Sequence, residues 1–231
     1  MANLVQNIDS FAYDNLFAGH EIPVLTKGVT LEAGQGKLVR GTVLGKVTKA
    51  VGTVTGPDTA NGTISAVTLG KSAKIGTYSL VCTTATAGVA VVFKVVDPDG
   101  MILNDAVAGT AYVGPINFTI TKGTSGFAID DTFTIPVIEG SGKYKVVNSA
   151  NVDGSQIADC ILADDTDTTT GDATAVAYRT GHFNRKALVF GGDDTADTHE
   201  QTLRTLGIFL SENAKPIERA KEGGNDNGRD T

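Results

Sequence analysis

Apolar and polar residues alternate with the period of two that is typical of β-strands over one long stretch, residues 63–138. The segments that share this alternation are 78–82, 91–95, 116–120 and 133–137. Turn residues separate them, and Asp97-Pro98-Asp99-Gly100, with Pro second and Gly fourth, predicts a type I turn. Alternating segments with turns between them predict a small β-sandwich.

The flanking parts of the chain also predict β structure, with one helix. The segments predicted as strands there are 24–26, 29–31, 38–48, 157–162, 173–179 and 208–210. Gly41 and Gly45 interrupt the third of these, and we expect each to mark a bend or a close approach of another backbone. Residues 194–206 predict a helix, with Asp194 or Thr195 as its cap and Gly207 as its stop.

Two turn-rich breaks, residues 53–62 and 139–142, bracket the predicted sandwich. If the sandwich were removed, the strand at 42–48 would continue into residues 143–147 through a turn, which is a hairpin. Hairpin tips tolerate insertions because both chain ends leave close together. The sequence therefore predicts a discontinuous host domain, residues 23–59 and 139–210, with an inserted module at 60–138.

Both ends of the chain lack a regular pattern. Residues 1–22 carry scattered apolar residues among Asp, Asn and Gly, and we expect an extended arm with no partner inside itself. An arm that packs on its own domain is an equal alternative. Residues 211–231 are polar and rich in Glu, Lys, Asn and Gly, which predicts a disordered tail.

Composition narrows the possible functions. The formal net charge of −7 leaves no basic footprint for nucleic acid. No apolar run approaches the ~18 residues that span a membrane, and the first residues lack the basic and apolar regions of a signal peptide. We expect synthesis in the cytoplasm, with Cys82 and Cys160 as small buried hydrophobes.

A search for catalytic chemistry finds no motif. Residues 198–203 (THEQTL) begin like a zinc-protease helix, but Leu203 stands where the second His ligand is required. The acidic loop Asp164–Asp167 offers oxygen ligands without the spacing of a calcium loop, so we expect a solvated turn. We therefore expect no catalytic, cofactor-binding or metal-binding residues and no cofactor.

Four blocks of the flanking parts resemble the head decoration proteins of lambda-like tailed phages. They are Gly41–Val47 (GTVLGKV), Gly142–Lys145 (GKYK), Asp153–Gln156 (DGSQ) with Ile161-Leu162, and Gly181–Asn184 (GHFN) with Ala187-Leu188. No single block is specific, but their order and spacing together are. Residues 63–138 depart from the pattern, since the shortest family members lack such a segment.

The resemblance implies a mostly β fold with minor helix, forming homotrimers without catalytic activity. Such trimers bind the major capsid protein on the outside of the expanded head, at local threefold sites, and stabilise it. By position, the N-terminal segment corresponds to the family's capsid-binding arm. Its candidate capsid contacts are Phe11, Tyr13, Leu16, Phe17 and Ile22. The expected location is the exterior of the virion capsid, with no nucleic-acid or membrane partner.

Three other functions remain open from the sequence: a phage tail or fibre component, a bacterial surface β-module that binds other molecules, and an enzyme of unknown type. The missing signal peptide disfavours the surface protein. Electron microscopy of particles would separate a head protein from a tail protein by its position.

Overall fold

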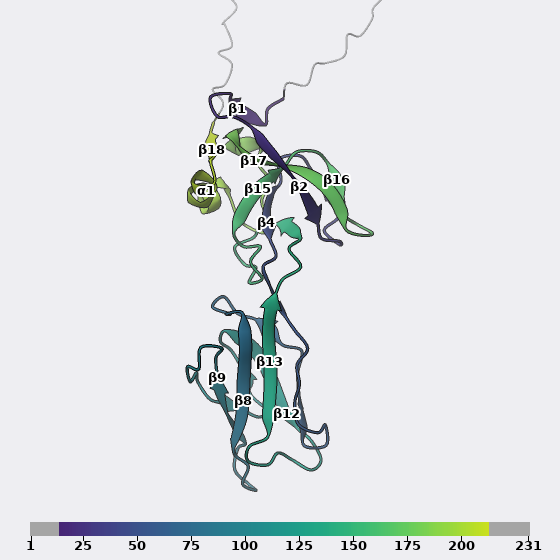
Figure 1. Cartoon of the computed structure of the whole chain (residues 1–231), viewed down its shortest axis with the longest axis vertical. Coiled ribbons are helices and arrows are strands. Elements are labelled where there is room, and N and C mark those ends of the chain that lie inside the picture. The colour runs from purple at the N-terminus through teal and green to yellow at the C-terminus, as the bar shows by residue number, and fades with distance from the viewer. Residues whose placement is uncertain (1–13, 213–231) are drawn as a thin grey trace, which may run out of the picture.

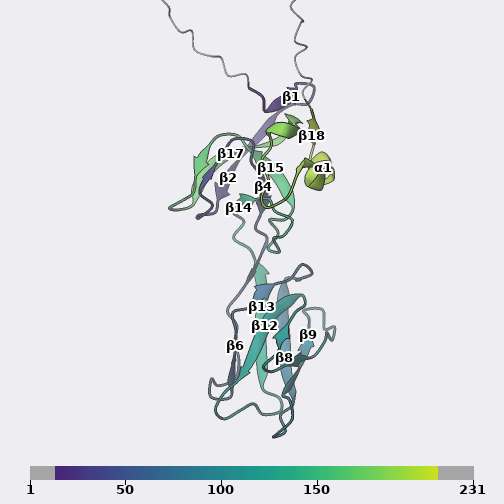
Figure 2. The same cartoon turned by 180° about the vertical axis from the view of Figure 1, so that it is seen from behind.

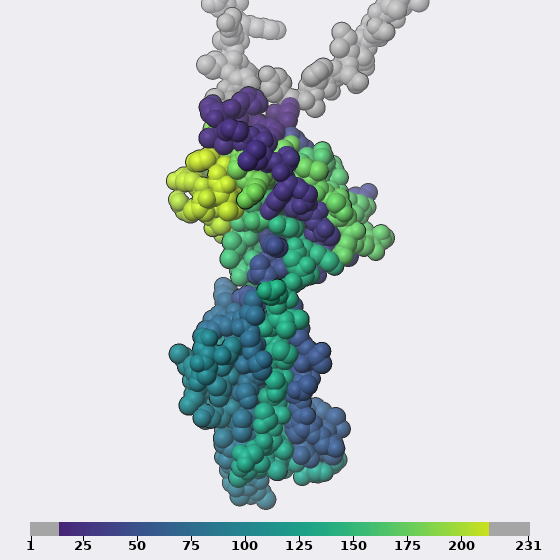
Figure 3. Space-filling view, in the orientation of Figure 1, coloured from purple at the N-terminus to yellow at the C-terminus, as the bar shows by residue number. Residues whose placement is uncertain are grey.

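The computed structural model describes residues 14–212, which form two lobes joined by a narrow waist (Figures 1 and 3). The barrel lobe contains residues 14–48 and 140–212, and the sandwich lobe contains residues 49–139. The view from behind shows the same two lobes end to end (Figure 2). The strands and sheets confirm the predicted mostly β fold. One cluster of buried apolar side chains lies in the sandwich lobe and two lie in the barrel lobe.

The barrel lobe is built on a closed cycle of five strands. Strand β17 pairs with β15 on one side and β2 on the other, and β4 and β14 complete the ring in the order β17–β15–β4–β14–β2. Its elements are β1 (Phe17–Gly19), β2 (Leu25–Leu31), β3 (Lys37–Leu38), β4 (Val43–Lys46), β14 (Tyr144–Val146), β15 (Ala158–Leu162), β16 (Thr166–Asp167), β17 (Ala173–Asn184), a 3-10 helix (Arg185–Ala187), α1 (Ala196–Thr205) and β18 (Ile208–Ser211).

The wall of the barrel carries an apolar core on both of its faces. Along β15, Cys160 and Leu162 belong to the cluster inside the barrel, whereas Ile161 belongs to the cluster on its outer face. Helix α1 and strands β1 and β18 supply partners for this outer cluster, including Leu203 from α1. Because both faces are covered there, β15 and the first three residues of β4 are buried almost throughout.

Helix α1 agrees with the predicted helix to within two residues at each end. Thr195 is its N-cap, and the Thr195 amide donates a hydrogen bond to Thr198 Oγ1 (3.2 Å). Gly207 follows the helix with φ +82°, a conformation that favours glycine. The buried side chains of the helix, Ala196, His199 and Leu203, form one stripe that faces the barrel.

A glutamine side chain completes the barrel where β2 and β14 meet in only one backbone pair, Leu31 with Tyr144. Gln35 accepts a hydrogen bond from the Val146 amide (2.8 Å) and donates to the Tyr144 carbonyl (3.1 Å). The side-chain amide of Gln35 therefore takes the place of a neighbouring strand's backbone.

Replacing Gln35 with Ala is expected to lower the free energy of unfolding by about 1–3 kcal/mol, because the Val146 amide is left without its partner. Urea unfolding followed by circular dichroism measures this change. Gln201→Ala, at an exposed position of α1, is the matched control and is expected to change stability by less than about 0.5 kcal/mol. Equal effects of the two substitutions would contradict this role for Gln35.

The sandwich lobe consists of two β-sheets packed face to face. One has the strand order β10-β9-β8-β13-β5, and in the other β12 pairs with β11, β6 and β7. The strands are β5 (Lys49–Val51), β6 (Gly62–Ile64), β7 (Thr68–Leu69), β8 (Gly76–Thr84), β9 (Val92–Val96), β10 (Ala106–Val107), β11 (Ala111–Tyr112), β12 (Ile116–Lys122) and β13 (Thr132–Glu139).

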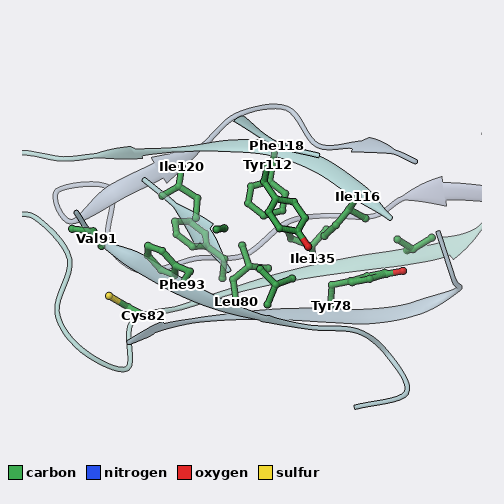
Figure 4. Packing of buried hydrophobic residues seen from close by; sticks show 14 of the residues in the cluster. Tyr78, Leu80, Cys82, Val91, Phe93, Tyr112, Ile116, Phe118, Ile120 and Ile135 are labelled. Atoms are coloured by element: carbon green, nitrogen blue, oxygen red, sulfur yellow. The ribbon is translucent and has the colours of Figure 1, made fainter. Parts of the chain in front are cut away.

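Alternate residues of these strands meet between the two sheets, as the alternating pattern predicts. Tyr78 and Leu80 point from β8 toward Ile116 and Phe118 of β12, and Phe93 lies beside Leu80 (Figure 4). Four of these five residues are fully buried, and Phe118 is 4% exposed. The predicted turn at 97–100 is also present, since the Gly100 amide donates to the Asp97 carbonyl (3.0 Å).

The sandwich lobe begins earlier than the break at residues 53–62 indicates. Strand β5 (Lys49–Val51) already pairs with β13, and Thr55 bridges to Thr134. The turn residues at 58–61 instead form a loop tip at the far end of the lobe, where Asn61 hydrogen-bonds Asp131 (3.1 Å). The expected boundary at residue 60 is therefore wrong by eleven residues. Turn residues mark loops within a lobe as well as connections between lobes, and the sequence does not distinguish the two.

The expected hairpin between the two flanking parts is confirmed. Strands β4 and β14 pair antiparallel, with Lys46 opposite Tyr144 and Leu44 opposite Val146. The sandwich lobe lies between these two strands in the chain. Gly45 allows the close approach that its position predicts, because a Cβ there would overlap the Ser155 carbonyl.

Two smaller expectations need correction. The acidic loop is not only a solvated turn, since Thr166 and Asp167 pair with β3. The predicted tail begins too early, because Ser211 is the last residue of β18 and lies opposite Asn184. Residues 213–231 lie outside the described part of the chain.

Candidate functional site

The segment from Asp14 to Ile22 is the place where the predicted arm joins the barrel lobe. The Asp14 carboxylate forms a two-pronged ion pair with Arg40, with N–O distances of 2.7 and 2.9 Å. The same carboxylate accepts a hydrogen bond from the Leu16 amide (3.1 Å). The Arg40 hydrogen bonds hold the pKa of Asp14 below its ordinary value, so this anchor stays ionised at neutral pH.

Leu16 fixes the segment to the core of the barrel lobe. Its side chain is 3% exposed and belongs to the outer cluster. Its carbonyl accepts a hydrogen bond from the Asn184 amide (2.8 Å), and the Asn184 side chain donates to the Asn15 carbonyl (3.0 Å). Gly41 makes room for it, because a Cβ there would lie 3.1 Å from Leu16 Cδ1 and 2.7 Å from the Ala187 carbonyl oxygen.

Phe17 continues this attachment as the first residue of β1. It pairs with Phe183 in the sheet, and its ring lies 5.1 Å from the Phe183 ring and 5.3 Å from the Tyr178 ring, measured between centroids. The Arg40 guanidinium lies over the Phe17 ring at 5.8 Å. Such contacts each contribute ~0.5–1.5 kcal/mol beyond the burial of area.

Of the two alternatives for the arm, packing on its own domain is therefore correct for Leu16 and Phe17. Ile22 is half-buried, and Phe11 and Tyr13 lie outside the described residues. Sequence periodicity missed this attachment because β1 is only three residues long, too short to show a repeat. Capsid contact by these five residues stays a prediction, and in this conformation Leu16 is not accessible to a partner.

His182 ties the two ends of the described chain together. Its Nδ1 lies 3.0 Å from Glu21 Oε2, and its Nε2 lies 2.8 Å from Ser211 Oγ. The hydrogen bond to His182 lowers the pKa of Glu21. Strands β1 and β18 both pair with β17, at the end of the molecule that is farthest from the sandwich lobe (Figure 1).

His199, in the segment at 198–203 that begins like a zinc-protease helix, has a structural role. His199 is buried beneath Phe190, and its Nε2 lies 2.8 Å from Asp194 Oδ2. Asp194 also accepts hydrogen bonds from the amide (2.6 Å) and hydroxyl (2.5 Å) of Ser149. Because Ser149 contacts the carboxylate and not the imidazole, this trio lacks the order of a nucleophile–base pair. Among residues 14–212, no three His, Cys, Asp or Glu side chains are placed to hold a metal ion.

The burial of Asp194 makes a pH prediction possible. Burial alone raises its pKa, but the bonds from Ser149 and His199 outweigh this, and the folded-state pKa lies below the ordinary value. Its contribution to stability is therefore present above the unfolded-state pKa of about 3.9 and is lost as the pH falls through the folded-state pKa. The stability difference between the wild type and Asp194→Asn is expected to shrink between about pH 5 and pH 2, as measured by urea unfolding. A difference that stays constant over this range would contradict it.

Both cysteines are buried, as expected, and they do not form a disulfide with each other. Burial raises the pKa of both thiols, that of Cys160 to about 12, so neither is a thiolate at neutral pH. In the described part of the chain, no helix is long and apolar enough to cross a membrane.

The comparisons with known proteins give one match. The family model described as "Bacteriophage lambda head decoration protein D" matches residues 5–208, which include the barrel lobe up to the start of β18 and the whole sandwich lobe. Neither the curated proteins nor the solved structures contain a match. The family match agrees with the sequence blocks in β4, β14 and β17, and it covers well over half of the chain. The chain belongs to the family of the bacteriophage lambda head decoration protein D.

Proposed function

We propose that this head decoration protein is a cement protein. It assembles as a homotrimer and binds the major capsid protein at the local threefold sites of the expanded head, which it stabilises from outside. The observation that carries this proposal is the family match over residues 5–208. The function needs no catalysis and no cofactor, because it arises from contacts alone.

The physical basis is preferential binding to one state of the capsid. A trimer that bridges subunits only in the expanded lattice stabilises that lattice by mass action. Three linked contacts bind with avidity, which raises the overall affinity by roughly 10²–10⁴ over a single contact. An extended N-terminal segment suits such a contact, since it can add a strand to an exposed sheet edge.

The root of this segment supports the proposal mechanically. Asp14 and Leu16 attach it to the core of the barrel lobe, so a load on the residues before Asp14 passes directly into the barrel. We propose Phe11 and Tyr13 as the first candidates for capsid contact, because they precede this anchor. Phe17 and Ile22 are half-buried and come second.

Binding to expanded and unexpanded heads tests the proposal. The purified protein is expected to saturate expanded heads and to bind unexpanded heads at least about tenfold more weakly, which corresponds to 1.4 kcal/mol per site. Native mass spectrometry is expected to give three times the chain mass of 23.8 kDa. Electron microscopy is expected to place density at the threefold positions. Equal binding to both head forms, or density on the tail, would overturn the proposal.

A further inference from the structure

We infer that the waist is a rigid joint that holds the sandwich lobe at a fixed orientation on the barrel lobe. The chain crosses the waist twice, through Val47–Lys49 and through Glu139–Gly142. Two short crossings, of which the second contains Gly140 and Gly142, would form a hinge if nothing else supported them. Here a third segment, the barrel-lobe loop at residues 148–156, supports both lobes.

The loop first fixes the outgoing crossing by backbone hydrogen bonds. The Asp153 carbonyl accepts bonds from the Thr48 amide (2.8 Å) and the Lys49 amide (2.9 Å). Lys49 is the first residue of β5, so the first strand of the sandwich lobe is bonded directly to the barrel lobe. Asp153 is itself held by Ser155, whose hydroxyl donates to the Asp153 carboxylate (2.6 Å).

The loop also contributes a side chain to the other lobe. Val152 packs against the apolar cluster of the sandwich lobe, although it belongs to the barrel-lobe part of the chain. On the sandwich side, Lys49 Nζ donates to the Ala73 carbonyl (3.0 Å), which ties the crossing to the loop before β8. The waist thus has a small apolar contact as well as hydrogen bonds, and rotation of the lobe would break both.

The glycines at the waist serve close packing and not flexibility. A Cβ at Gly140 would lie 2.7 Å from the Lys49 amide nitrogen and 2.7 Å from the Val47 carbonyl oxygen. Gly154 has φ +107°, and a Cβ there would overlap Thr48 Oγ1. The two crossings and the loop are therefore in close contact at Gly140 and Gly154.

The rigid joint gives the sandwich lobe a defined direction. Strands β1 and β18 lie at the opposite end of the molecule from this lobe (Figures 1 and 2). If the residues before Asp14 bind the capsid, which rests on the proposed function, the sandwich lobe projects away from the head at a constant angle. The loops at 58–61, 84–91 and 123–131 then form the outermost surface of the decorated particle.

Spin-label distances between the lobes test the rigid joint in the free protein. Labels are placed at Val176→Cys in β17 and Thr132→Cys in β13, both exposed, while Cys82 and Cys160 are at most 1% exposed. One narrow distance distribution is expected for the otherwise unchanged chain. A broad distribution would overturn the inference, whatever the protein does on heads.

Substitutions in the loop locate the cause. Gly154→Ala is expected to broaden the distribution, because its Cβ overlaps Thr48. Gly34→Ala is the matched control, since Gly34 has a similar positive φ of +85° and open space around it. Val152→Ser, a milder change, is expected to broaden it as well, and it serves as the test if Gly154→Ala does not fold. No broadening in any folded loop variant would overturn the role of the loop.

Microscopy of decorated heads separates this inference from the proposed function. Ordered density for the sandwich lobe above the head is expected with the unchanged chain, and blurred density with Val152→Ser. Ordered barrel density with a blurred sandwich lobe in the unchanged chain would overturn the rigid joint while leaving the proposed function intact. Absence of any bound protein would overturn the proposed function, and the spin-label result would still stand.

Discussion

Replacing residues 48–141 by the dipeptide Pro-Asp is expected to leave a barrel lobe that folds cooperatively. The chain would then run Val47-Pro-Asp-Gly142-Lys143, and strands β4 and β14 would form an ordinary hairpin. The deletion removes the whole sandwich core and none of the two barrel-lobe clusters. It would test directly whether the barrel lobe is an independent domain.

The hydrogen bonds around the deletion already have the geometry of this shorter loop. The Gly142 amide donates to the Val47 carbonyl (3.0 Å), and the Val47 amide donates to the Lys143 carbonyl (2.9 Å). A three-residue hairpin loop has the same two bonds, with a type I turn followed by a residue in the left-handed conformation. Gly142 has φ +72° and so occupies that third position. The sandwich lobe and its two crossings therefore take the place of the two turn residues between Val47 and Gly142.

Two further variants test the position of the insertion. Adding Gly142→Ala to the deletion is expected to lower the free energy of unfolding by about 1–2 kcal/mol more, because alanine is strained at positive φ. Replacing only residues 60–139 is expected to be worse, since it leaves β5 and Val54 without the core they pack against. Thermal unfolding followed by circular dichroism measures all three. Loss of cooperative unfolding in the Pro-Asp chain, with the 60–139 deletion folded, would contradict this description of the insertion.

The sequence predicted those parts of the fold that depend on local patterns. Period-two alternation located the four long strands of the sandwich, β8, β9, β12 and β13, since each has one face against the core, as with Tyr78 and Leu80. It did not mark the short strands β5, β6, β7, β10 and β11, which have only two or three residues each. The glycines at 45 and 207 were informative for a similar reason, because backbone conformation or close contact at each position excludes other residues. The hairpin at β4 and β14 followed from joining two such strands.

The parts it missed depend on contacts between distant residues. Gln35 closes the barrel by contacts with Tyr144 and Val146, about 110 positions away in the chain, and no local pattern marks it. The attachment of Leu16 requires Asn184, and the support of the waist requires Val152. Of the candidate site, the sequence located the N-terminal segment but not the point at which it becomes part of the barrel lobe.

That point decides what an N-terminal truncation does. Removing residues 1–13 is expected to leave stability within about 0.5 kcal/mol, because Asp14, Leu16 and their partners remain. Removing residues 1–20 is expected to lower the free energy of unfolding of the barrel lobe by about 2–5 kcal/mol from the loss of buried Leu16 alone. Loss of β1 and of the Phe17 ring contacts adds to this. If the arm had no partner in the barrel lobe, the two deletions would have equal effects on stability.

Head binding separates the structural role of the segment from its capsid role. If the residues before Asp14 hold the capsid, the 1–13 truncation is expected to bind expanded heads at least about 100-fold more weakly while it remains folded, since three linked contacts are lost together. Leu16→Ala is the complementary variant, because it destabilises the lobe yet keeps residues 1–13. At a temperature where Leu16→Ala is still folded, it is expected to bind more tightly than the 1–13 truncation. The reverse order would mean that the capsid contact lies in the barrel lobe itself, at the surface around Phe17 and Ile22.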